Sequence, residues 1–120
     1  MIGDGYRVSW DDAHQLARLD WAPGAHCDLA TAERVDRDVQ DLGHGEVRLL
    51  VDLRPNASID RDARHFFISL SPHYRAVALL AGSPATRMLA NFFLGFQRGT
   101  VPVRLFTSET DAVAWLTSDP

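Results

Sequence analysis

Three apolar runs in the second half of the chain predict buried β-strands. They span Glu46–Leu53, Arg75–Gly82 and Val101–Thr107, and turn or cap residues follow each of them. Short, nearly uninterrupted apolar runs are typical of strands that are covered on both faces of a sheet. A segment with helical spacing follows each run, so strand and helix alternate three times. This alternation predicts parallel strands that are joined by right-handed crossovers.

The three helical segments begin with residues that commonly start helices. Ser58 or Asp60 caps the first, and Ser83 caps the second, with Pro84 at its first helical position. Ser108 opens the third helix in the manner of a capping box. These start signals place each helix directly after a predicted strand, as a strand–helix–strand unit requires.

The first third of the chain predicts one further helix and a β-hairpin. Asp28 or Thr31 caps an amphipathic helix that stops at Gly43. Tyr6–Trp10 and Gln15–Trp21 alternate in polarity around a polar turn, which favours a hairpin, although the second segment also has helical propensity. The predicted fold class is therefore α/β, with an N-terminal hairpin followed by βαβαβα. This gives a mixed, mostly parallel five-stranded sheet with four helices.

An unusual density of phenyl rings marks the stretch RMLANFFLGFQRG. At about 100° per residue, Phe92, Phe93 and Phe96 share one helical arc with Met88 and Leu89. The arc is typical of a helix that packs flat on a sheet. The alternative is that part of it lines a ligand cavity or faces a second subunit.

Length and composition narrow the class of protein. The 120 residues suit one domain, and 46% of them are hydrophobic, as in an ordinary globular protein. The net charge is −4, and all twelve basic residues are arginines spread along the chain between acids, so we expect no nucleic-acid binding. No apolar run is long enough to span a membrane, and the first residues do not form a signal peptide. A single cysteine, Cys27, excludes an intrachain disulfide, and together these features predict a cytoplasmic protein.

Four stretches of the chain resemble one group of bacterial domains. They are RLLVDLR, SIDRDARHFF, AVALLAGSPATRMLANFFL and PVRLFTSETDAVAWL. The chain resembles the STAS/SEC14 group, which is related in fold to the anti-sigma-factor antagonists of the SpoIIAA type, over about Tyr6 to Thr117. The resemblance implies one STAS/SpoIIAA-like domain over residues 1–120, in a largely uncharacterised branch. Such domains bind protein partners, or in some branches nucleotides or lipids.

One functional residue of the resembled group is missing from this chain. Antagonists of the SpoIIAA type carry a phosphorylatable serine after an aspartate, where the helix after the LVDL strand begins. Asp60 matches that aspartate, but Arg61 and Asp62 stand where the serine is expected. The phosphoserine switch is therefore absent, and Ser58 is interpreted as a turn or capping residue. Asp62 suits the positive end of the helix dipole.

The motifs that usually carry catalysis or metal binding are missing. No two histidines stand at ligand spacing, and the motifs HExxH and CxxC are absent, so we expect no metal and no cofactor. Cys27 follows His26 near a helix start, but adjacent residues seldom point at one reacting atom, and a lone cysteine is usually a buried filler. Because no set of nucleophile, base and orienting group can be traced, we expect no enzyme.

Two loops follow predicted strands at their carboxyl ends, where α/β proteins commonly bind ligands. The segment GSPATR opens a helix after a strand, so Ser83 and Arg87 are candidate anion ligands, although the spacing of a phosphate-binding loop is lacking. Asp52 stands close to Arg54 and Arg64 in the sequence, and we interpret an ion pair among them as a fold device.

Two functional hypotheses follow. The first is a non-enzymatic, regulatory protein–protein interaction module, whose partner is a regulatory protein or a second copy in a homodimer. Its candidate partner-binding residues are Arg54, Ser58, Asp60, Arg61, Asp62 and Arg64. The alternative is a small-ligand or lipid-binding domain of the SEC14 kind. Its candidate pocket residues are Ser83, Arg87, Phe66, Phe92, Phe93 and Phe96, with Phe67 beside them.

Overall fold

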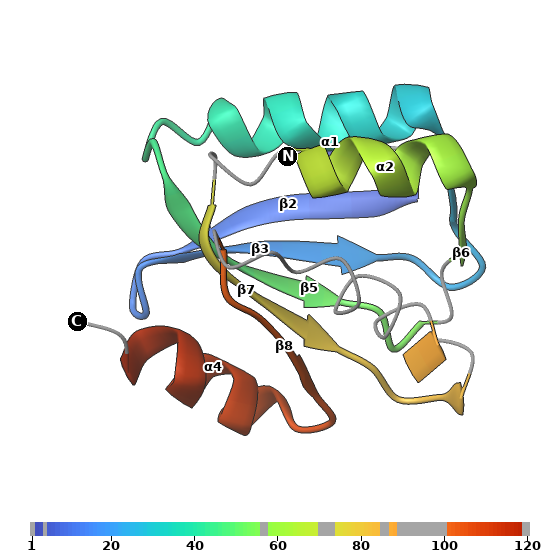
Figure 1. Ribbon diagram of the computed structural model, residues 1–120. Coiled ribbons are helices and arrows are strands. Elements are labelled where there is room, and N and C mark those ends of the chain that lie inside the picture. The colour runs from blue at the N-terminus through green and yellow to red at the C-terminus, as the bar shows by residue number, and fades with distance from the viewer. Residues whose placement is uncertain are drawn as a thin grey trace.

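A sheet with helices on both of its faces organises the chain, as Figure 1 shows. The computed structural model describes residues 2–3, 5–55, 58–69, 74–84, 87–88 and 101–118. Helices α1 and α2 lie side by side on one face of the sheet, and α4 lies on the opposite face (Figure 1). The expectation of a mixed α/β fold is confirmed.

Six strands pair in the order β1-β2-β3-β5-β7-β8. Pairing is antiparallel from β1 to β3 and parallel from β3 to β8. The strands are β1 Ile2–Gly3, β2 Tyr6–Asp11, β3 Leu16–Trp21, β5 Val47–Asp52, β7 Tyr74–Leu80 and β8 Val103–Phe106. The parallel half thus holds the three strands predicted from the apolar runs, and β3 joins them to the hairpin.

The predicted hairpin is formed by β2 and β3. Tyr6 pairs with Trp21, and the register continues to Asp11 opposite Leu16. In the turn, the side chain of Asp11 accepts a hydrogen bond of 3.1 Å from the backbone N–H of His14. Gln15 has a φ of 56°, a left-handed conformation that costs a non-glycine residue energy. Its side-chain amide donates to the backbone oxygen of Asp12 at 2.7 Å, which offsets part of that cost.

Three helices lie within the described residues: α1 Leu29–Gln40, α2 Arg61–Ser69 and α4 Glu109–Ser118. Each is capped by a side chain that accepts a backbone N–H. Asp28 accepts from Thr31 at 2.8 Å, and Asp60 accepts from Ala63 at 3.0 Å. The hydroxyl oxygen of Ser108 accepts from the backbone N–H of Asp111 at 3.3 Å. Caps of this kind satisfy N–H groups that a helix leaves without partners in its first turn.

The two faces of the sheet carry separate hydrophobic cores. The larger core lies under α1 and α2 and is built from alternate residues of the strands, such as Val8, Leu19 and Val51. The smaller core lies under α4, where Ala112 and Leu116 pack on the other set of alternate residues. Its strand members are Leu16, Leu50, Ala76, Ala78 and Leu80. Burial on both faces explains why the central strands read as unbroken apolar runs.

The structure corrects three details of the expected fold. The two-residue strand β1 adds a sixth strand to the expected five. Ser58 belongs to a short strand, β6 (Ser58–Ile59), which pairs in parallel with β4 (His26–Cys27), so it does not cap α2. Three helices are counted instead of four: of the expected Phe-rich helix, residues 84, 87 and 88 have helical geometry, and the remainder lies outside the described residues.

The three described helices contain 9 to 12 residues each. None of them is long and apolar enough to cross a membrane.

Candidate functional site

The carboxyl edge of the parallel strands gathers charged residues on the face that α4 covers. Alternation along β3 places Arg18 and Asp20 on the same side as Leu16, which belongs to the core under α4. Asp20 pairs in register with Asp52, the last residue of β5. The first residue of α4, Glu109, reaches the same edge from the end of β8. Residues far apart in the chain therefore meet where parallel sheets commonly bind ligands.

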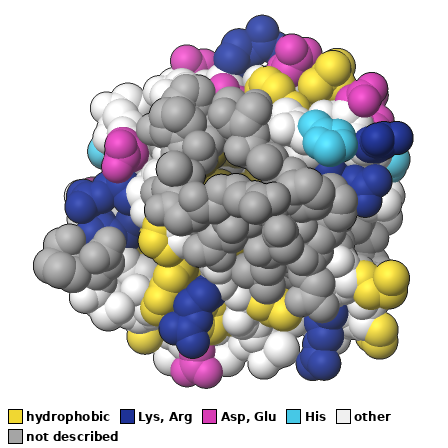
Figure 2. Space-filling view, viewed as in Figure 1, with side chains coloured by type: hydrophobic (Ala, Val, Ile, Leu, Met, Phe, Trp, Pro, Cys, Tyr) yellow, Lys and Arg dark blue, Asp and Glu magenta, His cyan; other side chains and the backbone are white. Residues whose placement is uncertain are grey.

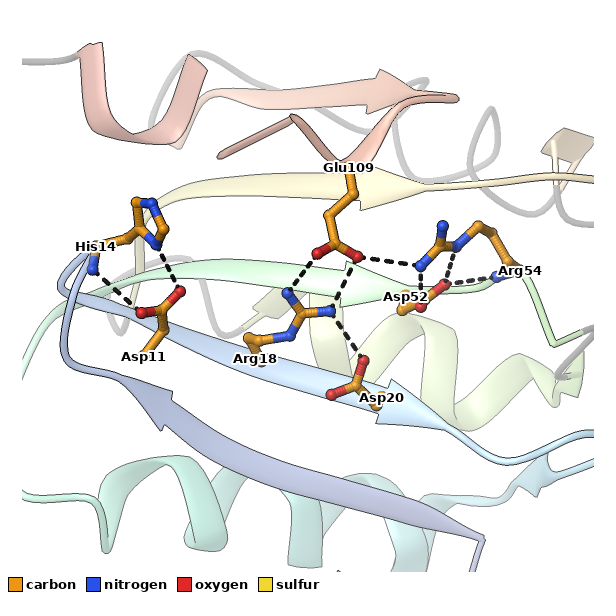
Figure 3. A network of polar contacts seen from close by, with 7 residues as sticks. All are labelled: Asp11, His14, Arg18, Asp20, Asp52, Arg54 and Glu109. Carbon is orange, nitrogen blue, oxygen red and sulfur yellow. Dashed lines mark hydrogen bonds and ion pairs between the residues drawn. The ribbon is translucent and has the colours of Figure 1, made fainter. Parts of the chain in front are cut away.

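Two arginines converge there on one carboxylate, as Figure 3 shows. Arg18 donates to both oxygens of Glu109, at 3.2 and 3.3 Å. Arg54 donates to Oε1 of Glu109 at 3.1 Å. Each arginine also holds an aspartate: Arg18 donates to Asp20 at 3.3 Å, and Arg54 donates to Asp52 at 3.0 and 2.8 Å. We call these five residues the carboxyl-edge network.

Burial differs across the carboxyl-edge network and shapes its electrostatics. The side chain of Asp52 is 11% exposed, whereas those of Arg54 and Glu109 are 43% and 42% exposed. Burial raises the pKa of Asp52, but hydrogen bonds from the side chain and backbone of Arg54 outweigh it, so the pKa is lowered. The hydrogen bond from Arg18 lowers the pKa of Glu109. Both carboxylates are therefore charged at neutral pH.

The segment GSPATR begins beside the carboxyl-edge network. A Cβ added at Gly82 would lie 3.3 Å from Cγ of Arg54, so the backbone after β7 passes close to that side chain. Ser83 is half-buried, and its backbone oxygen accepts a hydrogen bond from the N–H of Arg87 at 2.9 Å. Arg87 itself is exposed. The two loops that sequence reasoning singled out separately are thus neighbours in space.

A second polar cluster surrounds the start of α2. The backbone N–H of Ser58 donates to Ala25 at 2.8 Å, and that of Asp60 donates to Cys27 at 3.0 Å, which fastens β6 to β4. Nδ1 of His26 lies 2.8 Å from the hydroxyl of Ser58. Nε2 of the same ring lies 4.0 Å from the carboxylate of Asp60. The contacts tie the start of α2 to the connection between β3 and α1.

The exposed residues around this cluster form one polar surface. We call it the α2 N-terminal surface, and it consists of His26, Asp28, Ser58, Asp60, Arg61 and Asp62. Arg61 and Asp62 are exposed in the first turn of α2, whereas Arg64 is half-buried. The surface contains three carboxylates, of Asp28, Asp60 and Asp62, and one guanidinium, of Arg61. Its net charge is therefore negative when His26 is neutral. Of the six predicted partner-binding residues, Arg54 belongs instead to the carboxyl-edge network.

The environment of Cys27 does not suit a reactive thiol. Its side chain is 1% exposed and belongs to the core under α1 and α2. Burial raises the pKa of Cys27 to about 12, and the charges of Asp28 and Asp60 add to the effect. The thiol therefore stays protonated at neutral pH, whereas nucleophilic attack requires the thiolate. The neighbouring His26 ring contacts Ser58 and Asp60.

The predicted pocket residues are only partly described. Phe66 is half-buried, packs against the large core and lies 6.0 Å from Phe67 between ring centroids. Phe92, Phe93 and Phe96 lie outside the described residues. In the described part of the chain, the rings thus contribute to the core.

Charged side chains of both signs surround the face drawn in Figure 2. Among the residues described on that face, arginines lie at separate places around its rim, several with acidic side chains beside them (Figure 2). This arrangement matches the dispersed charge pattern of the sequence.

Sequence reasoning missed several members of these two clusters. Arg18 and Glu109 are 91 positions apart, and His26 and Ser58 are 32 apart. Glu109 could be expected only as an acidic residue at a helix start, and Arg18 only as a polar position in a strand. The one available signal was the rule that parallel strands end at a common edge, which brings together the residues after β3 and β5.

Comparisons with known proteins place the fold. The model of a family described as a domain of unknown function (DUF7793) matches residues 12–119. A solved structure from Shewanella loihica PV-4, an uncharacterised protein of the DUF3478 family with a SpoIIAA-like fold, is similar with a TM-score of 0.66 and 12% identity. The similarity covers 92% of this chain and 91% of that chain.

A second solved structure, a protein with unknown function from Arthrobacter sp. FB24, shares 33% identity over 94% of this chain and 100% of that chain, with a TM-score of 0.35. Comparison with curated proteins found no match. The similarity to the Shewanella protein confirms the expected STAS/SpoIIAA-like fold. Since the family model spans nearly the whole chain, the protein belongs to the family described as domain of unknown function DUF7793.

Proposed function

We propose that this protein is a non-enzymatic STAS-like interaction module that binds a protein partner through the α2 N-terminal surface. The observation that carries the proposal is the exposed, charged first turn of α2, where Arg61 and Asp62 project from a rigidly anchored helix start. Exposed charges that make no core contact are free to pair with a partner, and a fixed backbone lowers the entropy lost on binding.

The charge of the surface specifies the partner's chemistry. Asp28, Asp60 and Asp62 outnumber Arg61, so a partner surface rich in lysine or arginine is complementary. Pairs at the rim of an interface mainly raise the association rate and are weakened by salt. The proposal therefore includes a partner whose capture by this surface weakens as ionic strength rises.

A comparison of variants in partner capture tests the proposal. Tagged protein is used to capture partners from extracts of the native cells, and bound proteins are quantified by mass spectrometry. The double variant R61A/D62A is expected to lose the partner without a lower melting temperature, because neither side chain is buried. D41A is the matched control, since Asp41 is exposed at the opposite end of α1 from Asp28. Unchanged capture by the double variant would exclude this surface.

The alternative of a lipid or small-ligand pocket gains no specific support from the described residues. Phe66 and Phe67 pack against the core under α1 and α2. Gentle extraction followed by native mass spectrometry would reveal a co-purified ligand, and such a ligand would favour this alternative over the interaction module.

A further inference from the structure

The carboxylate of Glu109 occupies a position that two guanidinium groups share. Arg18 comes from the middle of β3, and Arg54 follows β5, so two neighbouring strands supply the donors (Figure 3). Arg18 presents two N–H groups side by side to both oxygens of Glu109, which is the fork geometry that recognises a carboxylate. The site is built from the sheet, whereas its occupant comes from the first turn of a helix.

Glu109 is held less closely than Asp52, the other carboxylate that Arg54 contacts. Its three contacts measure 3.1 to 3.3 Å. A close charge-assisted hydrogen bond measures about 2.7–2.9 Å. Arg54 holds Asp52 more closely, at 2.8 and 3.0 Å. The side chain of Glu109 is also 42% exposed, so solvent and solutes reach it, whereas Arg18 is 21% exposed. Displacing Glu109 therefore breaks long, partly exposed contacts and leaves the closer contacts between Arg54 and Asp52 in place.

The charges around the two arginines favour an occupant with one negative charge. Asp20 and Asp52 match the charges of Arg18 and Arg54. Glu109 also contacts both arginines, so two guanidinium groups and three carboxylates meet there. A monoanion in place of Glu109 carries the same charge as this residue and leaves the net charge around the two arginines unchanged. A phosphate dianion would bring a second charge close to two aspartates, which is unfavourable.

We propose that the Arg18–Arg54 pair is a binding site for a small carboxylate ligand, and that Glu109 fills this site in the free protein. Binding exchanges one carboxylate for another and frees the first turn of α4 from the sheet edge. Glu109 acts as an internal competitor that sets the affinity. The site lies at the carboxyl ends of β3 and β5, and its existence does not depend on the partner-binding surface.

An amide NMR titration tests the site directly. Acetate is added to the full chain at constant ionic strength, with chloride as the reference anion, and the amides of Arg18, Arg54 and Glu109 are followed. In the native protein, acetate is expected to shift these signals in a saturable way, and inorganic phosphate is expected to bind more weakly. E109Q removes the competing charge and is expected to lower the Kd for acetate about tenfold, the equivalent of roughly 1.4 kcal/mol.

Two further variants make the result decisive. R18K keeps the charge but loses the fork, so it should weaken acetate binding about fivefold or more while the protein remains folded. E33Q removes an exposed carboxylate on the opposite face of the sheet and should leave the affinity unchanged. The proposal is overturned if acetate acts like chloride on the native protein, if E109Q binds no more tightly than the native chain, or if R18K binds equally well. Phosphate binding as tight as acetate binding would overturn the assignment to a carboxylate.

Discussion

The two faces of the sheet differ in the size of their hydrophobic cores and in the charge of their side chains. Under α1 and α2, the larger core extends from the hairpin to β8, and the side chains facing it are apolar. On the other face, α4 covers a smaller core over β5 and β7. Nearer the hairpin, the same face carries the charged residues Arg18 and Asp20 of β3 instead of apolar core residues. Among the described helices, only α4 lies on this face (Figure 1), and Arg18 and Asp20 form an ion pair on it.

The comparison shows that one β-strand can contribute to a hydrophobic core on one face and to a charged network on the other. In β3, Ala17 and Leu19 face the large core, whereas Arg18 and Asp20 take part in the carboxyl-edge network. The period of two along a strand makes this division possible, because neighbouring residues point to opposite faces. Hydrophobic burial holds one face together, and ion pairs around Arg18 and Asp20 connect β3 to α4 on the other.

The largest expected effect comes from opening a cavity in either core. L19A, in the large core, and L80A, under α4, should each lower the free energy of unfolding by about 2–5 kcal/mol. Urea denaturation followed by circular dichroism measures both. If L80A cost under about 1 kcal/mol, the α4 face would not be a packed core, and the comparison of the faces would fail.

Breaking the carboxyl-edge network should have the next largest effect. R18A leaves Glu109 and Asp20 without their shared donor at a site that is only partly exposed. We expect a loss of roughly 1–3 kcal/mol, below the cost of breaking a fully buried pair. R37A, an exposed arginine on α1, is the control and should change stability by no more than about 0.5 kcal/mol. Equal effects of the two variants would show that the network adds nothing to stability.

A single polar contact beneath α1 gives a smaller effect on the apolar face. The hydroxyl of Tyr6 donates to Asp38 at 2.6 Å, and burial, followed by this hydrogen bond, raises the pKa of Tyr6 to about 12. Y6F should cost about 0.5–1.5 kcal/mol, the usual net value of one hydrogen bond. The same denaturation assay measures it. A cost as large as that of R18A would mean that both faces depend equally on polar contacts.

The smallest expected effect is the dependence of stability on acid. Because the pKa values of Asp52 and Glu109 are lowered by folding, their stabilisation is present above their unfolded pKa values of about 4 and is lost as pH falls through the lower folded values. E109Q should therefore be less stable than the native chain at pH 7, by about 1 kcal/mol or less, and this difference should shrink below about pH 4. E33Q serves as the control in the same titration. A difference that does not change with pH would contradict the role of the charge.

Much of the fold could be predicted because burial leaves a direct signature in sequence. The runs that became β5, β7 and β8 are apolar on both sides of the strand, and they were predicted within a few residues. The cap Ser108 could also be predicted, and Asp28 as one of two candidates, because an N-cap depends on local hydrogen bonds. The strands β4 and β6 were missed, since two residues are too few to show a period.

The candidate site was less predictable, since it depends on contacts between distant segments. Arg54 and Asp52 were expected to pair because they are close in sequence, and they do. No sequence pattern indicates that Glu109 bridges Arg54 and Arg18, because this contact depends on how α4 packs against the sheet. The exposed pair Arg61 and Asp62 was predicted as the partner-binding face, and this function stays a prediction.

The enclosed position of Cys27 makes the protein convenient for site-directed chemistry. As the one thiol in the chain, it lies shielded in the core and stays protonated, so a maleimide reagent added to the native protein finds no fast target. D62C would then create a single reactive handle on the α2 N-terminal surface, and D41C a matching one at the far end of α1. A photoactivated crosslinker attached at either place would report which side of the molecule a bound protein touches, without first removing the native cysteine.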